Sequence, residues 1–263
     1  YFFNNHNQLS NLFHNLKQEL MVNITILLIV FLTSFLSGIL GMAGGMILMV
    51  CLTLFYSVAG AMVIHGLVQI AANGSRCLFL KSHVQKSLII NYLIGTVLAF
   101  FVFIFVTFVP DQAVVFLILG SLPILVKYSL SLKNLDITNP RTSVIAGFTM
   151  TTLQLLAGVS GPVLDAFYQN TKLSRLEIVA NKAIAQTASH LFKVLYYFIF
   201  VGTDSILPIW FIVLSMFTAI LATRFGTIVL SHWNDISFRK YTNQLISGIS
   251  LICLAQGIYL LIQ

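Results

Sequence analysis

Charge is what this sequence has least of. Of its 263 residues, 14 are Lys or Arg and 7 are Asp or Glu, so charged residues make up 8% of the chain, whereas soluble proteins carry about 25%. Hydrophobic residues make up 58%, more than a water-soluble core of this size needs. The composition therefore excludes a soluble domain and indicates an all-α integral membrane protein.

Cysteine is also scarce, and Cys51, Cys77 and Cys253 each lie in an apolar stretch, which is no disulfide framework. The net charge is +7, but the basic residues form no run, which argues against a nucleic-acid partner. The chain also lacks a His-Glu-x-x-His motif, a paired acidic catalytic motif and a nucleotide-binding loop. We therefore expect neither an enzyme nor an ATP-driven pump, and no cofactor or metal.

Residues 1–22 form the one polar, Asn-rich stretch. Its apolar residues share one helical face, which is typical of an amphipathic helix on the bilayer surface: Leu9, Leu12, Phe13, Leu16 and Leu20. Alternatively, these residues precede the natural start of the protein, because Met21 lies directly before the first long apolar run.

From Asn23 onward, the apolar runs have the length of ~20 residues that a membrane-spanning helix needs. We predict a first membrane repeat over residues 23–132, a polar linker over 133–141 and a second membrane repeat over 142–263. Each repeat holds four of the eight predicted spans: Ile24–Val50, Val58–Leu80, Ser87–Val109, Ala113–Leu132, Ser143–Tyr168, Ile178–Val201, Leu207–Leu230 and Tyr241–Ile262.

An offset of 117 residues relates the two halves. It places Gly41 and Gly44 on Gly158 and Gly161, and it places four polar residues on four others: His65, Gln69, Asn73 and Arg76 on Lys182, Gln186, His190 and Lys193. Polar residues are scarce here, so the match indicates two copies of one four-helix unit. The spacing i, i+4, i+8, i+11 puts each set on one narrow helical stripe, and such stripes face inward because polar groups facing lipid are costly.

Glycines gather at the same place in both halves, in Ser37–Gly45 of the first span and Gly158–Pro162 of the fifth. One interpretation is close helix packing through small residues. The other is a helix broken inside the membrane, because proline lacks an N–H and glycine accepts non-helical dihedral angles. Broken spans at matching positions in two halves are typical of a transporter binding site, and free helix N-termini attract anions.

A glycine motif opening each half, followed by a helix with a polar stripe, resembles the TauE/SafE family of sulfite exporters and related anion permeases. The segments most like the family are Gly38–Gly45, Gly158–Pro162 and Asn181–Lys193, and the resemblance covers roughly residues 24–262. The first motif departs from the family pattern in having Ala43 and no proline shortly after it. The resemblance implies a non-enzymatic carrier for sulfite, sulfoacetate or related sulfonates and organic anions, working by alternating access in the cell membrane.

We expect the substrate to bind between the halves, at residues of both glycine motifs and both stripes: Gly41, Gly44, Gly45, His65, Gln69, Asn73, Arg76, Ser160, Gly161, Lys182, Gln186, His190 and Lys193. Lys193 is the deepest cation. It is structural if Asp165 or Glu177 pairs with it, and otherwise a diffusible anion is its natural counter-ion.

Alternatives stay open for several of these residues. Arg76 lies near the end of its span, so its side chain could extend to the lipid headgroups. His65 and His190 titrate near neutral pH, which makes protons an expected coupling ion. Hydrogen-bonded interior imidazoles are the alternative, and Gln69, Gln186 and Asn73 could equally fasten helices together.

The topology has two solutions. Four crossings per half would make the repeats parallel, but the basic residues of the two halves then fall on opposite sides: Lys81, Lys86, Lys133 and Arg141, against Lys172, Arg175, Arg239 and Lys240. Inverted repeats fit better and need an odd number of crossings, which a re-entrant segment or a second short span within Ile24–Ser57 would supply. An anion channel is the alternative function, although it predicts a polar lining in more than two spans, and Leu88–Val109 is almost wholly apolar.

Overall fold

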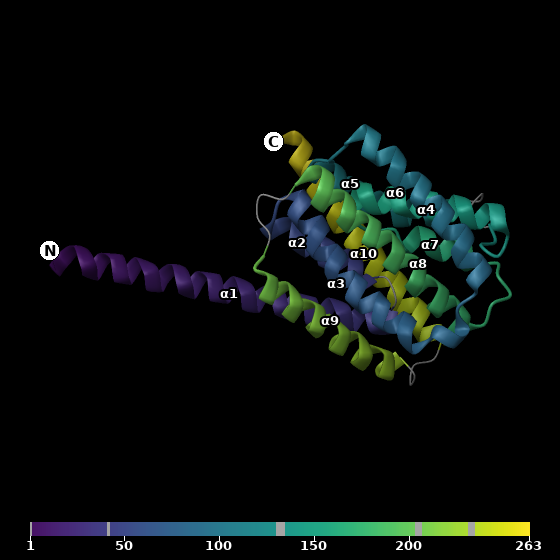
Figure 1. Cartoon of the computed structure of the whole chain (residues 1–263), viewed down its shortest axis with the longest axis horizontal. Helices are drawn as coiled ribbons and strands as arrows, with labels where there is room; N and C mark the ends of the chain where they lie inside the picture. Colours follow the sequence, from purple (N-terminus) through teal and green to yellow (C-terminus); the bar gives the residue numbers. More distant parts are fainter. Residues whose placement is uncertain (1, 41–42, 130–134, 203–206, 231–234) are drawn as a thin grey trace.

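The computed structural model of the chain describes the backbone of residues 2–40, 43–129, 135–202, 207–230 and 235–263, and their side chains except for 2–13, 15, 16, 40, 230 and 235–242. In these ranges every regular element is a helix (Figure 1). They are α1 (Phe2–Leu40), α2 (Ala43–Phe55), α3 (Val58–Phe79), α4 (Lys86–Val106), α5 (Gln112–Tyr128), α6 (Pro140–Ala157), α7 (Gly161–Tyr168), α8 (Arg175–Tyr196), α9 (Ile209–Leu230) and α10 (Asp235–Ile262), with a 3-10 turn (Lys81–His83) and a π-helix, η3 (Tyr197–Val201).

Six helices in the described part of the chain are long and apolar enough to cross a membrane: α1 (over Lys17–Ile39), α3, α4, α8 (with η3), α9 and α10. Large apolar side chains such as Phe105 and Ile209 are exposed on the outside, as expected of faces in contact with lipid. The prediction of an all-helical membrane protein is thus confirmed. The eight spans were not all found, because the fourth is the shorter helix α5 and the fifth is divided between α6 and α7.

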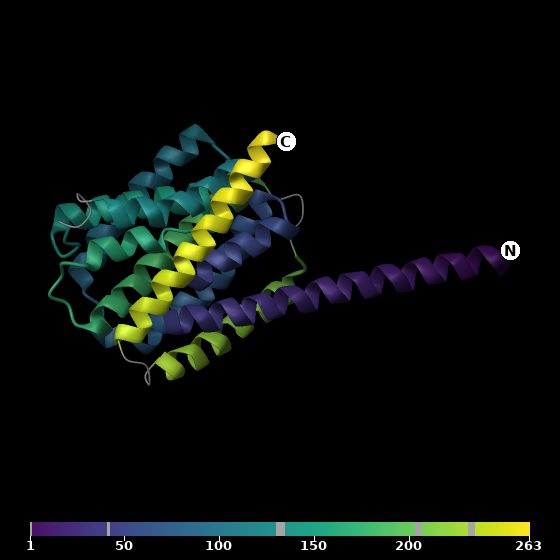
Figure 2. The same cartoon turned by 180° about the vertical axis from the view of Figure 1, so that it is seen from behind.

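The polar N-terminal stretch is part of α1, which is one unbroken helix from Phe2 to Leu40. Its first half projects away from the other helices (Figures 1 and 2). Most side chains of residues 1–16 lie outside the described set, so the amphipathic face stays a prediction.

Helices α1 and α2 form a hairpin, here called hairpin 1. A Cβ atom on Gly44 would overlap the carbonyl oxygen of Thr33 and lie 2.7 Å from the backbone nitrogen of Ser37, so α2 starts in backbone contact with the end of α1. Ile26 and Val30 of α1 then share one apolar cluster with Met49 of α2. The chain therefore turns back on itself after α1, where a single span from Ile24 to Val50 was predicted.

Helices α6 and α7 form the corresponding hairpin 2. Gly158 ends α6 in the left-handed region at φ 75°, a conformation that glycine adopts without strain. Three residues later Gly161 starts α7, with Pro162 in its first turn. The N–H of Ile137, just before α6, donates to the carbonyl of Phe167 at the far end of α7 (3.1 Å). Helix α7 therefore returns toward the start of α6, and its eight residues span only about 12 Å.

The two stripe helices, α3 and α8, pack against each other in antiparallel orientation. His65 near the start of α3 contacts Lys193 near the end of α8, at 2.8 Å between Nδ1 and Nζ. At the other end, the N–H of Gln85, beyond α3, donates to Oδ1 of Asn181 near the start of α8 (2.9 Å). Helix α3 is the most enclosed of the six long apolar helices, with 72% of its apolar window buried, so the stripes lie inside the bundle.

Two further helix pairs cross at backbone distance. A Cβ on Gly95 of α4 would overlap the carbonyl of Val144 in α6, and one on Gly147 of α6 would overlap that of Tyr92 in α4. Gly38 of α1 and Gly226 of α9 approach each other in the same way. The long arm of each hairpin is thus fixed to another helix without intervening side chains.

Candidate functional site

The polar stripes of α3 and α8 meet in the interior. Seven of the eight stripe residues are buried, and Lys182 is half-buried: His65, Gln69, Asn73, Arg76, Gln186, His190 and Lys193. The inward orientation predicted from their spacing is therefore correct.

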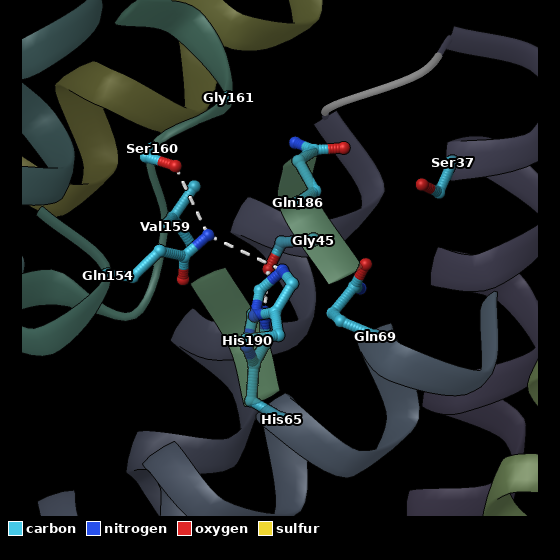
Figure 3. A pocket seen from close by; sticks show the side chains of 10 residues that line it. All are labelled: Ser37, Gly45, His65, Gln69, Gln154, Val159, Ser160, Gly161, Gln186 and His190. Carbon is cyan, nitrogen blue, oxygen red and sulfur yellow. Dashed lines mark hydrogen bonds between the residues drawn. The ribbon is translucent and has the colours of Figure 1, made fainter. Parts of the chain in front are cut away.

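A cavity of at most about 260 Å³ lies between the stripes and the two hairpin turns. Figure 3 shows side chains from both hairpins and both stripe helices pointing toward it. Its lining consists of Ser37, Gly45, His65, Gln69, Gln154, Val159, Ser160, Gly161, Gln186 and His190. None of these carries an acidic or permanently cationic side chain, so the lining is polar but uncharged.

Two hydrogen-bond donors in this lining are buried without a partner. Nε2 of Gln69 has none, while Oε1 of the same amide accepts from Nδ2 of Asn73 (3.1 Å). The ring of His190 has one partner at most, because Nε2 lies 3.4 Å from Nε2 of Gln154 (Figure 3) and Nδ1 has none. An amide nitrogen only donates, so Nε2 of His190 accepts and Nδ1 carries an unused hydrogen. Buried polar groups are normally paired, so these two donors point to a ligand.

The first turns of two short helices reach the same cavity, through Gly45 of α2 and Gly161 of α7. The first N–H groups of a helix have no acceptor within the helix, and the helix dipole makes that end attractive to anions. The cavity therefore combines unpaired side-chain donors with helix ends that favour negative charge.

Lys193 lies behind the cavity wall. Its side chain is completely buried, and Nζ contacts Nδ1 of His65 (2.8 Å) and the carbonyl of Gly158 (3.1 Å). Nε2 of His65 in turn lies 2.9 Å from the carbonyl of Gly45 (Figure 3). A carbonyl only accepts, so Nε2 carries the ring hydrogen and Nδ1 accepts from the lysine. One chain of contacts thus joins the turn of hairpin 2 to the start of α2.

Arg76 takes the equivalent position in the first half, 117 residues before Lys193. Its Nη2 donates to the carbonyl of Ser37 (2.9 Å) in the last turn of α1, as Lys193 donates to Gly158 at the end of α6. Both basic side chains therefore lie at a helix C-terminus, where the dipole stabilises a positive charge. Arg76 is buried and does not extend to the headgroups.

His65, His190 and Lys193 form one basic cluster, with the two imidazole centroids 5.3 Å apart. A second positive charge there would repel the first by about 3 kcal/mol at an effective dielectric constant of about 20. Among the described residues no carboxylate lies within ion-pair distance of the cluster. The arrangement favours a single positive charge at most, as long as no anion is bound.

The two carboxylates considered as partners of Lys193 lie elsewhere. Asp165 of α7 forms an ion pair with Lys182 of α8. Glu177 accepts from Ser174 in the capping box of α8 and from Nε2 of Gln85. Lys182, predicted as a substrate ligand, therefore joins α8 to α7 in this structure and does not line the cavity.

Seven of the predicted binding residues line the cavity: Gly45, His65, Gln69, Ser160, Gly161, Gln186 and His190. Asn73, Arg76, Lys182 and Lys193 hold neighbouring groups instead, Gly44 packs on α1, and Gly41 lies outside the described residues. Ser37, Gln154 and Val159 also line the cavity and were not predicted. The offset of 117 offered a signal, because it places the polar Ser37 on the polar Gln154.

In the comparison with protein families, the model of the sulfite exporter TauE/SafE matches residues 26–251 of the chain. Comparison with curated proteins and with solved structures gave no significant match.

Proposed function

Because the chain belongs to the TauE/SafE family of sulfite exporters, we propose that it carries small sulfite- or sulfonate-type anions across the cell membrane by alternating access. The family consists of transporters rather than enzymes, and the six long apolar helices make this chain a multi-pass membrane protein. The cavity between the hairpins and the stripe helices is the proposed binding site.

The observation that carries this proposal is the pair of unpaired donors in an uncharged cavity, Nε2 of Gln69 and Nδ1 of His190. An oxyanion presents acceptors only, so it satisfies both donors at once. The positive ends of α2 and α7 support the same sign of charge. A cation would find no carboxylate in this lining, where Oε1 of Gln154 is the buried side-chain acceptor without a partner among the described residues.

The size of the cavity restricts the substrate. In this structure its enclosed space holds little more than one water molecule. Sulfite and short-chain sulfonates need the smallest movement of the lining, and bulky organic anions need a larger one.

The test is uptake of labelled sulfite into proteoliposomes. Substituting His190→Ala removes a donor to the anion, and a hydrogen bond to a charged group contributes about 1.5–3 kcal/mol. We expect the KM for sulfite to rise roughly 10- to 100-fold. Unsaturable flux carried as electric current would instead indicate a channel, and uptake by the variant equal to that of the parent would remove His190 from the site.

We further propose that a proton crosses with the anion and that Lys193 is its binding site. A buried ammonium without a counter-charge is costly, and within the described ranges no carboxylate faces it. Asp165 is paired with Lys182, Arg76 is held on α1, and the other groups beside Lys193 are the bases His65 and His190. An anion beside His65 supplies the missing charge, so the lone pair of Nζ takes a proton from water as the anion binds.

Substituting Lys193→Arg tests the coupling, because arginine keeps its proton. The parent is expected to accumulate sulfite inside the vesicles about tenfold for each pH unit by which the external solution is more acidic than the interior. The variant should exchange internal for external sulfite yet lose this accumulation, because its empty form cannot release the proton and return.

Lys127→Arg, an exposed substitution in α5, is the matched control and should accumulate like the parent. Absence of exchange in the parent would refute transport itself. Two results would refute only the coupling to protons. One is sulfite exchange by the parent with an accumulation that does not depend on pH, and the other is a Lys193→Arg variant that accumulates as much sulfite as the parent. If Lys193→Arg does not fold, the internal pH recorded during sulfite efflux from parent vesicles decides the same point.

A further inference from the structure

The structure places the loops between helices on two opposite faces of the bundle. The first, here called the terminal face, holds the loops α2–α3, α4–α5 and η3–α9. Nε2 of Gln112 at the start of α5 donates to the carbonyl of Thr53 at the end of α2 (2.7 Å), and Tyr196 at the end of α8 donates to the carbonyl of Phe108 in the α4–α5 loop (2.9 Å). In Figure 1 both chain termini lie toward this side.

The second, here called the basic face, holds the loops α3–α4, α5–α6 and α7–α8. Gln85 of the α3–α4 loop contacts Asn181 and Glu177 at the start of α8. Ile137 before α6 contacts Phe167 at the end of α7. Arg224 near the end of α9 lies over the ring of Phe79 at the end of α3, 4.7 Å from its centroid, so the end of α9 belongs to this face as well.

The hairpins explain this division. Helix α2 returns the chain to the side from which α1 started, and α7 does the same after α6. Each half thus makes five passes, α1–α5 in the first half and α6–α10 in the second. Because five is odd, each half begins and ends on opposite sides of the bundle. Inverted halves follow, which agrees with the antiparallel packing of α3 on α8, two helices whose bounds differ by the offset of 117 residues.

When each half is counted as five passes, the exposed basic residues of both halves lie on the same face of the bundle. Among the described side chains, seven exposed basic residues lie at the basic face: Lys81, Lys86, Lys127, Arg141, Lys172, Arg175 and Arg224. The terminal face has Lys17 as its basic residue in the described side chains, together with Glu19 and Asp111. Four-crossing repeats had divided the basic residues between the two sides.

We infer that the basic face is cytoplasmic and that both the start of α1 and the end of α10 lie on the opposite side of the membrane. Lys and Arg accumulate in the short cytoplasmic loops of membrane proteins. Six of the seven exposed basic residues of this face lie within or directly beside such loops, and Arg224 lies near the end of α9. The half-buried Lys182–Asp165 pair lies on the half of α8 that begins at this face, so this pair lies on the cytoplasmic side of the bundle.

The test is labelling of single cysteines in cells with a membrane-impermeant maleimide, after replacing Cys51, Cys77 and Cys253 by serine. Val109→Cys and Gln263→Cys, on the terminal face, should be labelled in intact cells. Ser82→Cys and Lys172→Cys, on the basic face, should be labelled at least tenfold more after permeabilisation. This result does not depend on the substrate, so it stands apart from the transport assays.

Labelling of Ser82→Cys in intact cells, or of Val109→Cys and Gln263→Cys on opposite sides, would overturn the inference. If the serine replacements prevent folding, the full chain with its natural cysteines is joined at Gln263 to alkaline phosphatase or to green fluorescent protein. An active phosphatase supports the orientation, because that enzyme matures outside the cytoplasm, and a fluorescent partner contradicts it.

Discussion

Substituting Gln69→Glu is expected to weaken sulfite binding about 1,000-fold, because a carboxylate about 4 Å from an anion raises its energy by about 4 kcal/mol at an effective dielectric constant of about 20. The exchange preserves the shape of the side chain and the acceptor that Asn73 contacts at Oε1. It replaces the unpaired donor Nε2 by a negative charge. The dissociation constant measured by competition against labelled sulfite gives the effect directly.

Gln263→Glu makes the same chemical change at the exposed end of the chain and should bind sulfite like the parent. A Gln69→Glu variant that keeps its affinity would place the anion elsewhere. If the Gln69→Glu variant instead takes up a cation, the charge of the lining decides the charge of the ligand. That result would support the proposal that the natural cavity binds anions.

Substituting Gly44→Ala is expected to abolish transport and to lower stability by about 3 kcal/mol or more, the upper range for overpacking a core. The added methyl group would overlap the carbonyl of Thr33 and lie 2.9 Å from Cβ of Ser37. The obstruction is backbone, which cannot rotate away. Helix α2 would have to leave α1, taking the carbonyl of Gly45 away from His65. The melting temperature in detergent and uptake into vesicles measure the two effects.

Gly248→Ala is the matched control, because nothing lies within 4 Å of the added Cβ. Alanine is about 1 kcal/mol better than glycine inside a helix, so this variant should melt at or slightly above the parent temperature and transport normally. Normal uptake by Gly44→Ala would show that hairpin 1 is not closed in the active protein.

The sequence predicted the chemistry of the site better than its geometry. The spacing of Gln69, Gln186 and His190 along apolar helices was enough to predict buried polar edges, because a helix has a fixed period and lipid excludes polar groups. Pro162 and its glycines likewise marked the end of a helix. Both inferences depend on local properties of the chain, which a sequence displays directly.

Direction and pairing were not predictable in the same way. Glycine permits a break, but nothing local to Gly44 tells whether the chain continues or turns back, since the contact with Thr33 depends on packing. The partner of Asp165 was undecided for a similar reason. Lys182 and Lys193 lie on the same helix, and the path of α7 alone decides that Asp165 reaches Lys182. Gln154 was missed because α6 has no polar stripe, so its single amide gave no periodic signal.

The helix pairs that cross in backbone contact at glycines limit how the protein opens. Gly147 fixes α6 to α4, and Gly38 with Gly226 fixes α1 to α9, through backbone contacts that side-chain rotation cannot loosen. Helix α2 is in backbone contact with α1 as well, at Gly44 and Thr33, and the carbonyl of Gly45 contacts the ring of His65. Helix α7 is joined to α8 by the Lys182–Asp165 pair and to the segment before α6 by the hydrogen bond from Ile137 to Phe167. The long arms and α2 thus form one rigid frame, whereas the contact of α7 with α8 includes an ion pair that side-chain rotation can open.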